Sequence, residues 1–170
     1  MKLKNIAVFL LVLTICVSLM TGCGGEDDPY KGLVLYEHPV GISLYMEKGF
    51  SETEIDGVLG CYQGEIANVR FGKDTFEALA EVGYTDDMTE SEYAKLVIAA
   101  YGLDSEVKTD GYGNVYIAYV ENISGADVSY YAFFNKSTDA FWMTTFMCMT
   151  EYAEKLEDDF CLWASSISVK

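Results

Sequence analysis

The chain of 170 residues carries 27 acidic and 11 basic side chains, so its formal net charge is −16 at pH 7. A charge of this sign repels phosphate groups, and we therefore expect no nucleic acid partner. Apolar and aromatic residues make up 51% of the chain, which is enough for a packed core and excludes a largely disordered protein.

The amino-terminal segment has the features of an export signal. Lys2 and Lys4 provide a positive start, and an apolar run follows at residues 6–20. This run is shorter than the ~20 residues that a helix needs to cross a bilayer. It leads through small residues to Cys23. A charged start, a short apolar run and a small-residue exit predict a secretory signal peptide rather than a membrane span.

The residues around Cys23 resemble the lipobox of bacterial lipoproteins. The motif reads Leu19-Met20-Thr21-Gly22-Cys23, with Met20 where that family most often has leucine. The resemblance implies signal cleavage between Gly22 and Cys23 and attachment of a diacyl lipid to the Cys23 thiol. Two acyl chains anchor a protein stably where one is marginal. We therefore expect a lipoprotein at the cell membrane, lipid-anchored and facing outside the cytoplasm.

This interpretation divides the chain into a signal peptide at residues 1–22, a lipidated tether at 23–31 and a single domain at 32–170. The tether is short, polar and contains glycine, as flexible linkers do. Removal of Lys2 and Lys4 with the signal takes two of the 11 basic residues, so the formal charge becomes −18 instead of −16. We attribute this charge to solubility rather than to a specific cationic partner.

The first half of the domain combines short strands with two helices. Period-two patterns and turn residues predict strands at residues 33–37, 41–47, 56–63 and 65–72. The last two strands are expected to form a hairpin near Gly64, and a short helix follows at residues 74–81. Thr89 and Glu92 form a capping-box pattern that opens a second helix, which Gly102 ends. The apolar face expected for this helix comprises Tyr93, Leu96, Val97, Ala100 and Tyr101.

The second half of the domain contains three strands and a final helix. The strands are expected at residues 115–121, 128–135 and 140–149, separated by short polar turns that favour an antiparallel meander. The strand at 128–135 is apolar on both faces, so we expect it near the centre of the sheet with helices on each side. The last helix begins at Thr150 and places Leu156, Phe160 and Trp163 on one side.

This order of elements predicts an α+β domain in which an antiparallel β-sheet is flanked by helices, an α/β/α sandwich. The domain also resembles the Mog1/PsbP-like group of small domains. The resemblance rests on Ile42-Ser43-Leu44, on Gly49-Phe50 and on the closing Ser166-Ile167-Ser168-Val169. This chain has Met46-Glu47-Lys48 where the group commonly has a proline before the glycine. The resemblance implies the fold and no activity, because unrelated tasks share that architecture.

The sequence contains no recognisable catalytic motif. His38 is the one histidine of the chain, and its position beside Pro39 is typical of a turn residue. A catalytic base needs a nucleophile within hydrogen-bond reach. The one pairing that the sequence offers is Cys61 with His38, which we keep as part of an alternative. After loss of Cys16 and modification of Cys23, the remaining cysteines are Cys61, Cys148 and Cys161, and we interpret them as buried free thiols.

No cofactor or metal is expected. Two groups of acidic residues invite comparison with cation sites, namely Asp86, Asp87, Glu90 and Glu92, and Glu154, Glu157, Asp158 and Asp159. Neither group has the alternating oxygen ligands around a glycine that a calcium loop requires. Acidic residues at a helix start are also favoured by the helix dipole. We interpret both groups as solvated surface.

Two functional hypotheses follow. The first is a lipid-anchored extracytoplasmic accessory or binding module of unknown ligand without catalysis, which meets a protein or envelope partner. The export signal, the predicted lipid attachment at Cys23 and the missing catalytic motif support it. Aromatic rings with a polar tip are also frequent at recognition surfaces, but we interpret the tyrosines in question as structural; they are Tyr45, Tyr62, Tyr112, Tyr116 and Tyr119. Aromatic residues are also simply favoured in strands. The alternative is a cell-envelope hydrolase that uses carboxylates or the Cys61 and His38 pairing.

Overall fold

The structure is a computed structural model that describes residues 28–170, and its folded unit runs from Gly32 to Lys170. The predicted signal peptide, its cleavage site and Cys23 lie outside the described residues. The elements of the folded unit are β1 (Val34–His38), β2 (Ile42–Met46), β3 (Ser51–Glu52), β4 (Gly60–Gln63), β5 (Ala67–Thr75), α2 (Phe76–Glu81), α3 (Glu90–Tyr101), β6 (Val107–Thr109), β7 (Val115–Ile123), β8 (Ala126–Lys136), β9 (Ala140–Met149), α4 (Thr150–Ala164) and β10 (Ser168–Val169).

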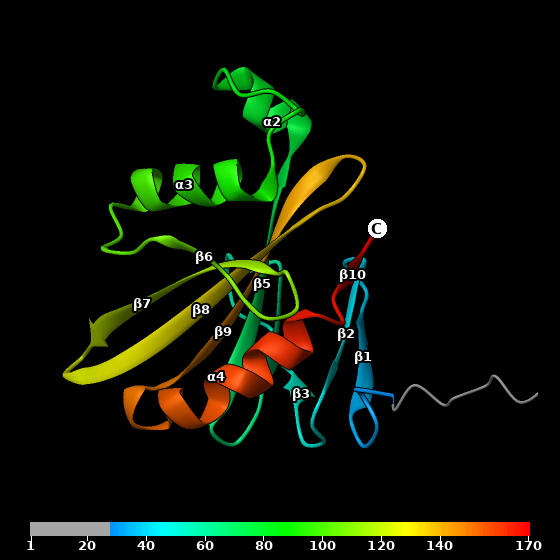
Figure 1. Ribbon diagram of the computed structural model, residues 1–170, viewed down its shortest axis with the longest axis vertical. Coiled ribbons are helices and arrows are strands. Elements are labelled where there is room, and N and C mark those ends of the chain that lie inside the picture. Colours follow the sequence, from blue (N-terminus) through cyan, green and yellow to red (C-terminus); the bar gives the residue numbers. More distant parts are fainter. Residues whose placement is uncertain (1–27) are drawn as a thin grey trace, which may run out of the picture. The chain divides into compact units, whose positions relative to one another are not determined.

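The strands form two antiparallel sheets (Figure 1). The large sheet has seven strands in the order β3-β4-β5-β9-β8-β7-β6, and the small sheet has three in the order β1-β2-β10. The predicted β4–β5 hairpin and the β7–β8–β9 meander are confirmed by their pairing. The meander is connected to the first half of the domain through β9, which pairs with β5 over the whole length of β5.

One face of the large sheet, which we name the closed face, is covered by α4 and by the small sheet. Alternate residues of β8 and β9 point to this face, among them Phe133 and Phe146, and pack against Phe160 and Trp163 of α4. The small sheet adds the buried side chains of β2, which are Ile42, Leu44 and Met46. The expected period-two burial of β2 is therefore confirmed.

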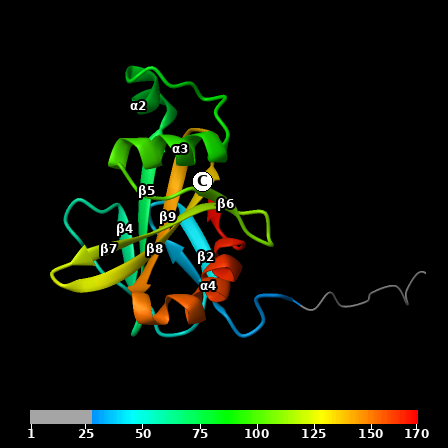
Figure 2. The same ribbon diagram turned by 60° about the vertical axis from the view of Figure 1, so that its left-hand side comes forward.

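The opposite face, which we name the open face, is covered by α3 and α2 along one part of its length. Ile117, Ala132 and Phe134 pack there against Tyr93 and other residues of the helices. Figure 1 shows α3 and α4 on opposite sides of the sheet, as the prediction of an α+β domain with a sheet flanked by helices requires. Figure 2 shows the β7–β8 hairpin extending past both helices. Part of the open face therefore has no helix over it.

Helix α3 begins and ends as the sequence predicts, but its buried face differs. Thr89 Oγ1 accepts the Glu92 N–H and the Glu92 side chain accepts the Thr89 N–H, and Gly102 ends the helix in the left-handed conformation. The buried residues are Tyr93, Ala94 and Val97, whereas Tyr101 is 73% exposed. The expected apolar face was therefore wrong at its carboxyl-terminal end, where Ala100 and Tyr101 are both exposed because no buried side chain packs over them.

Other differences concern element boundaries. The strand expected at residues 56–63 begins only at Gly60, and residues 56–59 belong to the loop that precedes it. Thr75 is the N-cap of α2, so Asp74 and Thr75 extend β5 instead of opening the helix. The short strands β3, β6 and β10 were not predicted, because two or three residues carry no periodic pattern.

Among the described residues, no helix combines the length and apolar character needed to cross a bilayer.

Candidate ligand-binding groove

A continuous depression follows the open face where α3 leaves it uncovered. It consists of three adjoining hollows of about 250, 260 and 220 Å³, and Met143 lines all of them. The loop that contains Gly57 borders one side, and the end of α3 with Val97 and Tyr101 borders the other. We name this depression the groove; the residues that carry the argument below are Arg70, Gly72, Tyr101, Tyr119, Tyr130 and Met143.

The floor of the groove is open at Gly72 of strand β5, because glycine has no side chain to fill it. Side chains alternate along β5, so Arg70, Gly72 and Asp74 face the groove while Phe71 faces the closed side. A Cβ at Gly72 would meet the Met143 side chain at 3.5 Å, which is ordinary contact. Glycine within a strand weakens it and often marks a place where another chain or ligand approaches closely.

A pair of stacked tyrosines forms one end of the groove. Tyr119 of β7 lies directly opposite Tyr130 of β8, and their ring centroids are 4.9 Å apart with an interplanar angle of 2°. Burial, and after it the nearby Glu121 carboxylate, raises the pKa of Tyr119 to about 12. Burial also raises the pKa of Tyr130, which hydrogen-bonds to Glu121. Both phenols therefore stay protonated at neutral pH and can donate hydrogen bonds.

Arg70 supplies the positive charge of the groove. It is the one arginine of the chain, and its side chain is exposed. Its neighbours across the sheet are Cys61 of β4 and Thr145 of β9. The nearby guanidinium opposes the effect of burial on the pKa of the Cys61 thiol. In residues 28–170 Arg70 has no ion pair with a carboxylate, although the chain has 27 acidic residues.

The structure separates Cys61 from His38. The His38 ring packs edge-on against Tyr62 and Phe71 of the closed face, with centroids 5.6 and 5.5 Å away. A Cβ at Gly60 would lie 2.5 Å from His38 Cε1, so the ring rests directly on that glycine. Cys61 lies between Gly60 and Tyr62 and points to the opposite side of β4, because successive strand residues alternate. The backbone of the sheet therefore stands between the thiol and the imidazole.

The remaining polar atoms of His38 have structural partners. Its Nδ1 accepts the Val40 N–H at 3.3 Å, and its Nε2 lies 3.4 Å from Glu52 Oε1. These contacts join the end of β1 to β3 beside the closed face. The geometry gives His38 a packing and tethering role.

The three cysteines of the folded unit are free and buried. Burial raises the pKa of Cys148, and it raises that of Cys61 although Arg70 acts in the opposite direction. Burial, with the nearby Asp110 carboxylate, raises the pKa of Cys161 to about 12. All three are therefore thiols at neutral pH, and reactive thiolates need the opposite environment.

The acidic groups noted in the sequence do not converge on a cation site. The described residues contain no cluster of three or more histidine, cysteine, aspartate or glutamate side chains that could hold a metal ion. In the first group, Glu92 caps α3, and hydrogen bonds from Thr89 lower its pKa. This role accounts for Glu92 without a ligand.

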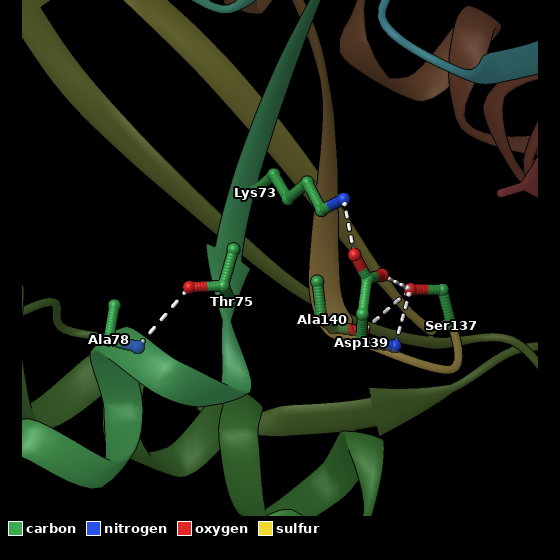
Figure 3. A network of polar contacts seen from close by, with 6 residues as sticks. All are labelled: Lys73, Thr75, Ala78, Ser137, Asp139 and Ala140. Atoms are coloured by element: carbon green, nitrogen blue, oxygen red, sulfur yellow. Dashed lines mark hydrogen bonds and ion pairs between the residues drawn. The ribbon is translucent and has the colours of Figure 1, made fainter.

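A second polar network lies at the other end of β5 (Figure 3). Lys73 Nζ donates to Asp139 Oδ2 at 3.1 Å, and Ser137 Oγ donates to Asp139 Oδ1 at 2.7 Å. These hydrogen bonds, that of Ser137 first, lower the pKa of Asp139. Thr75 Oγ1 accepts the Ala78 N–H at 3.2 Å and caps α2. The network fixes the β8–β9 turn against β5, so we assign it to structure.

The tyrosines singled out in the sequence divide between the core, the surface and the groove. Tyr62 and Tyr116 are buried on the closed face, and Tyr112 is 57% exposed in the loop before β7. Only Tyr119 belongs to the groove. Sequence reasoning missed Arg70, Gly72, Tyr101, Tyr130 and Met143. One available signal was the single arginine of an acidic chain, placed in the middle of a strand.

Comparison with known proteins concerns the fold. No protein-family model matches the sequence, and no curated protein matches it. A protein from Bacteroides thetaiotaomicron VPI-5482, known from a crystal structure at 1.50 Å resolution, is similar over 80% of this chain with a TM-score of 0.53 and 8% identity. This chain spans 48% of that protein. The solution structure of cyanobacterial PsbP (CyanoP) from Synechocystis sp. PCC 6803 is similar over 88% of this chain and 98% of its own, with a TM-score of 0.48 and 15% identity. Neither likeness extends to a ligand or an activity.

Proposed function

We propose that this protein is a non-enzymatic binding module, anchored by a lipid on Cys23 to the outer side of a bacterial membrane, which holds its partner in the groove. The lipobox resemblance supports the anchor. The groove supports the binding role, because it is an aromatic depression in the surface of a strongly acidic protein. Recognition sites on proteins are enriched in tyrosine and arginine, and the groove contains Tyr101, Tyr119, Tyr130 and Arg70.

The single observation that carries this proposal is the uncovered Tyr119 and Tyr130 pair beside Arg70. Elsewhere on the sheet, aromatic rings of this kind are covered by a helix, as Phe133 and Phe146 are by α4. A half-buried ring pair at the edge of a hollow gains from further burial, because apolar area removed from water stabilises a complex. The tyrosine hydroxyls add directed hydrogen bonds.

The arrangement of titratable groups favours binding over catalysis. The thiol of the predicted pairing, Cys61, is buried and its pKa is raised, and the one histidine of the chain lies on the closed face. Hydrolysis by a thiol requires a thiolate and a base within hydrogen-bond reach. We therefore prefer the binding role to a hydrolase that pairs Cys61 with His38.

The test is capture of a partner by the exported protein, purified in detergent, immobilised and incubated with envelope extract of the source bacterium. We expect a bound species that is lost when Tyr119 and Tyr130 are both replaced by alanine. Tyr112→Ala is the matched control, because it removes an exposed tyrosine outside the groove. Equal capture by all three proteins would contradict the assignment of the groove. Mass spectrometry of the same material should show a diacylated Cys23 as the first residue.

A further inference from the structure

The charge of Arg70 indicates the kind of ligand that the groove can bind. The chain contains 27 carboxylate side chains and one guanidinium, yet the described residues provide no ion pair for that guanidinium. It lies in the middle of β5, beside the hollow that Tyr119 and Tyr130 line. Arginine binds carboxylates and phosphates through two parallel N–H donors, so an unpaired arginine in a hollow is suited to an anionic group.

The charge of the whole protein limits the ligand to few negative charges. At physiological ionic strength an exposed charge acts over a Debye length of about 8 Å, so the acidic side chains around the groove repel a second anionic group that lies outside the reach of Arg70. In the groove itself, Glu121 and Asp74 add further negative charge. A ligand with one carboxylate and an otherwise uncharged body satisfies both conditions. Polyphosphates and highly acidic polymers do not.

The rest of the groove favours an apolar body over a sugar. The hollow between α3 and β7 is lined mainly by aliphatic side chains, including Val97, Leu103, Ile117 and Met143. Buried sugar hydroxyls need hydrogen-bond partners, and unpaired ones cost free energy. Along β5 the groove runs from Arg70 to Asp74, which is about 13 Å at the rise of an extended strand. That length suits roughly four residues of extended peptide.

We propose that the groove binds the carboxyl-terminal end of an extended, apolar peptide segment. In this arrangement the terminal carboxylate pairs with Arg70, and the ring of Tyr130 and the side chain of Met143 contact the last side chains. The hollow under α3 takes a further apolar side chain. This inference rests on the proposed function, because it names the ligand class of the same groove.

The test compares two fluorescently labelled peptide pools by fluorescence anisotropy with the exported protein in detergent. Both pools contain the same randomised apolar hexapeptides, and they differ only in a free carboxylate or a carboxamide at the end. We expect the free-acid pool to bind about tenfold more tightly or better, the range of one charge-assisted hydrogen-bonded pair. Equal affinity for the two pools, or no binding of either, would overturn the inference.

Two substitutions separate the role of Arg70 from general charge. Arg70→Gln should remove the difference between the pools, and Arg70→Lys should restore part of it, because lysine keeps the charge without the paired donors. Lys108→Gln is the matched control: it also removes one positive charge from an exposed strand residue, and Lys108 lines none of the three hollows. Thermal unfolding verifies that the variants remain folded, as expected for the exposed Arg70 side chain.

Binding of a sugar acid and envelope capture by the variants provide two further tests. Arg70-dependent binding of an oligogalacturonate, with no preference between the peptide pools, would replace the peptide by a sugar acid and overturn the inference. Envelope capture that depends on Tyr119 and Tyr130 but persists in Arg70→Gln would also overturn it, while the proposed binding function would stand. Unchanged envelope capture by both variants would contradict the assignment of the groove as the binding site.

Discussion

The two faces of the seven-stranded sheet have similar side chains and different surroundings. On the closed face, Phe133, Phe146 and Phe160 form a continuous aromatic core with Trp163. On the open face, Tyr119 and Tyr130 stack on each other with no helix over them. The closed face therefore accounts for most of the stability that packing supplies, and the open face retains apolar area for a partner. Substitutions that compare the faces test this division.

Alkaline pH should have the largest effect and should destabilise the whole fold, because both faces contain tyrosines whose pKa is raised by burial. Burial raises the pKa of Tyr116 and Tyr131 on the closed face to about 12, compared with 10.0 for a free phenol. A group whose pKa is raised by folding contributes stability below its unfolded pKa and loses it as the pH rises through the folded value. We expect stability to be constant with respect to these groups below pH 10 and to fall between about pH 10 and 12. Circular dichroism and phenolate absorbance should change together.

This prediction has a control on the closed face. Tyr116→Phe removes one titrating group and should shift the alkaline midpoint upward, since the phenolate no longer has to be accommodated. A midpoint that is unchanged would show that burial of this phenol does not govern the transition.

Removal of an aromatic ring should cost far more on the closed face than on the open face. Trp163 is 1% exposed and packs against Phe50, Phe146 and Phe160, so Trp163→Ala should lower the free energy of unfolding by about 3–5 kcal/mol. Tyr101→Ala, at the 73% exposed ring that borders the groove, should change it by less than about 0.5 kcal/mol. Urea unfolding measures both, and similar losses would contradict the comparison.

Two strand glycines provide a smaller and more local comparison. Gly60→Ala places a Cβ 2.5 Å from the His38 ring on the closed face and should cost about 1–3 kcal/mol, because the ring has to move within packed surroundings. Gly72→Ala meets only Met143 at 3.5 Å and should be neutral or slightly stabilising, since alanine has the lower backbone entropy when unfolded. The same Gly72→Ala protein should bind peptide more weakly because the floor of the groove is raised.

The smallest effect concerns the helix that borders the groove. Thr89→Ala removes the side-chain acceptor of the α3 capping box and should cost about 1 kcal/mol. Thr89→Ser keeps the hydroxyl and should retain most of the stability. Urea unfolding distinguishes the two, and equal losses would indicate that the cap contributes through the methyl group.

Local patterns predicted the elements whose signals are contained in a few neighbouring residues. The Thr89 and Glu92 pair identified the start of α3, and alternation in β2 identified its buried face. The apolar run of β8 also indicated a strand covered on both sides, which contacts with α3 and α4 confirm. These features depend on hydrogen bonds and burial within one segment, so the local sequence is sufficient to predict them.

The groove depends on strands that are distant in sequence. Arg70 and Gly72 come from β5, Met143 from β9, Tyr130 from β8 and Tyr119 from β7. Their proximity follows from the pairing of β5 with β9, which no local pattern specifies. The exposure of Tyr101 likewise depends on where α3 lies over the sheet. Side chains that look like ordinary strand or helix residues therefore become a site only through the topology.

The short strand β10 has a consequence for how the protein is made. It pairs with β2, and the Lys170 N–H donates to the Gly41 carbonyl, so residues near the two ends of the folded unit depend on each other. The small sheet cannot be completed until residues 168–169 have been synthesised and have reached β2. Contacts of such large sequence separation also slow folding.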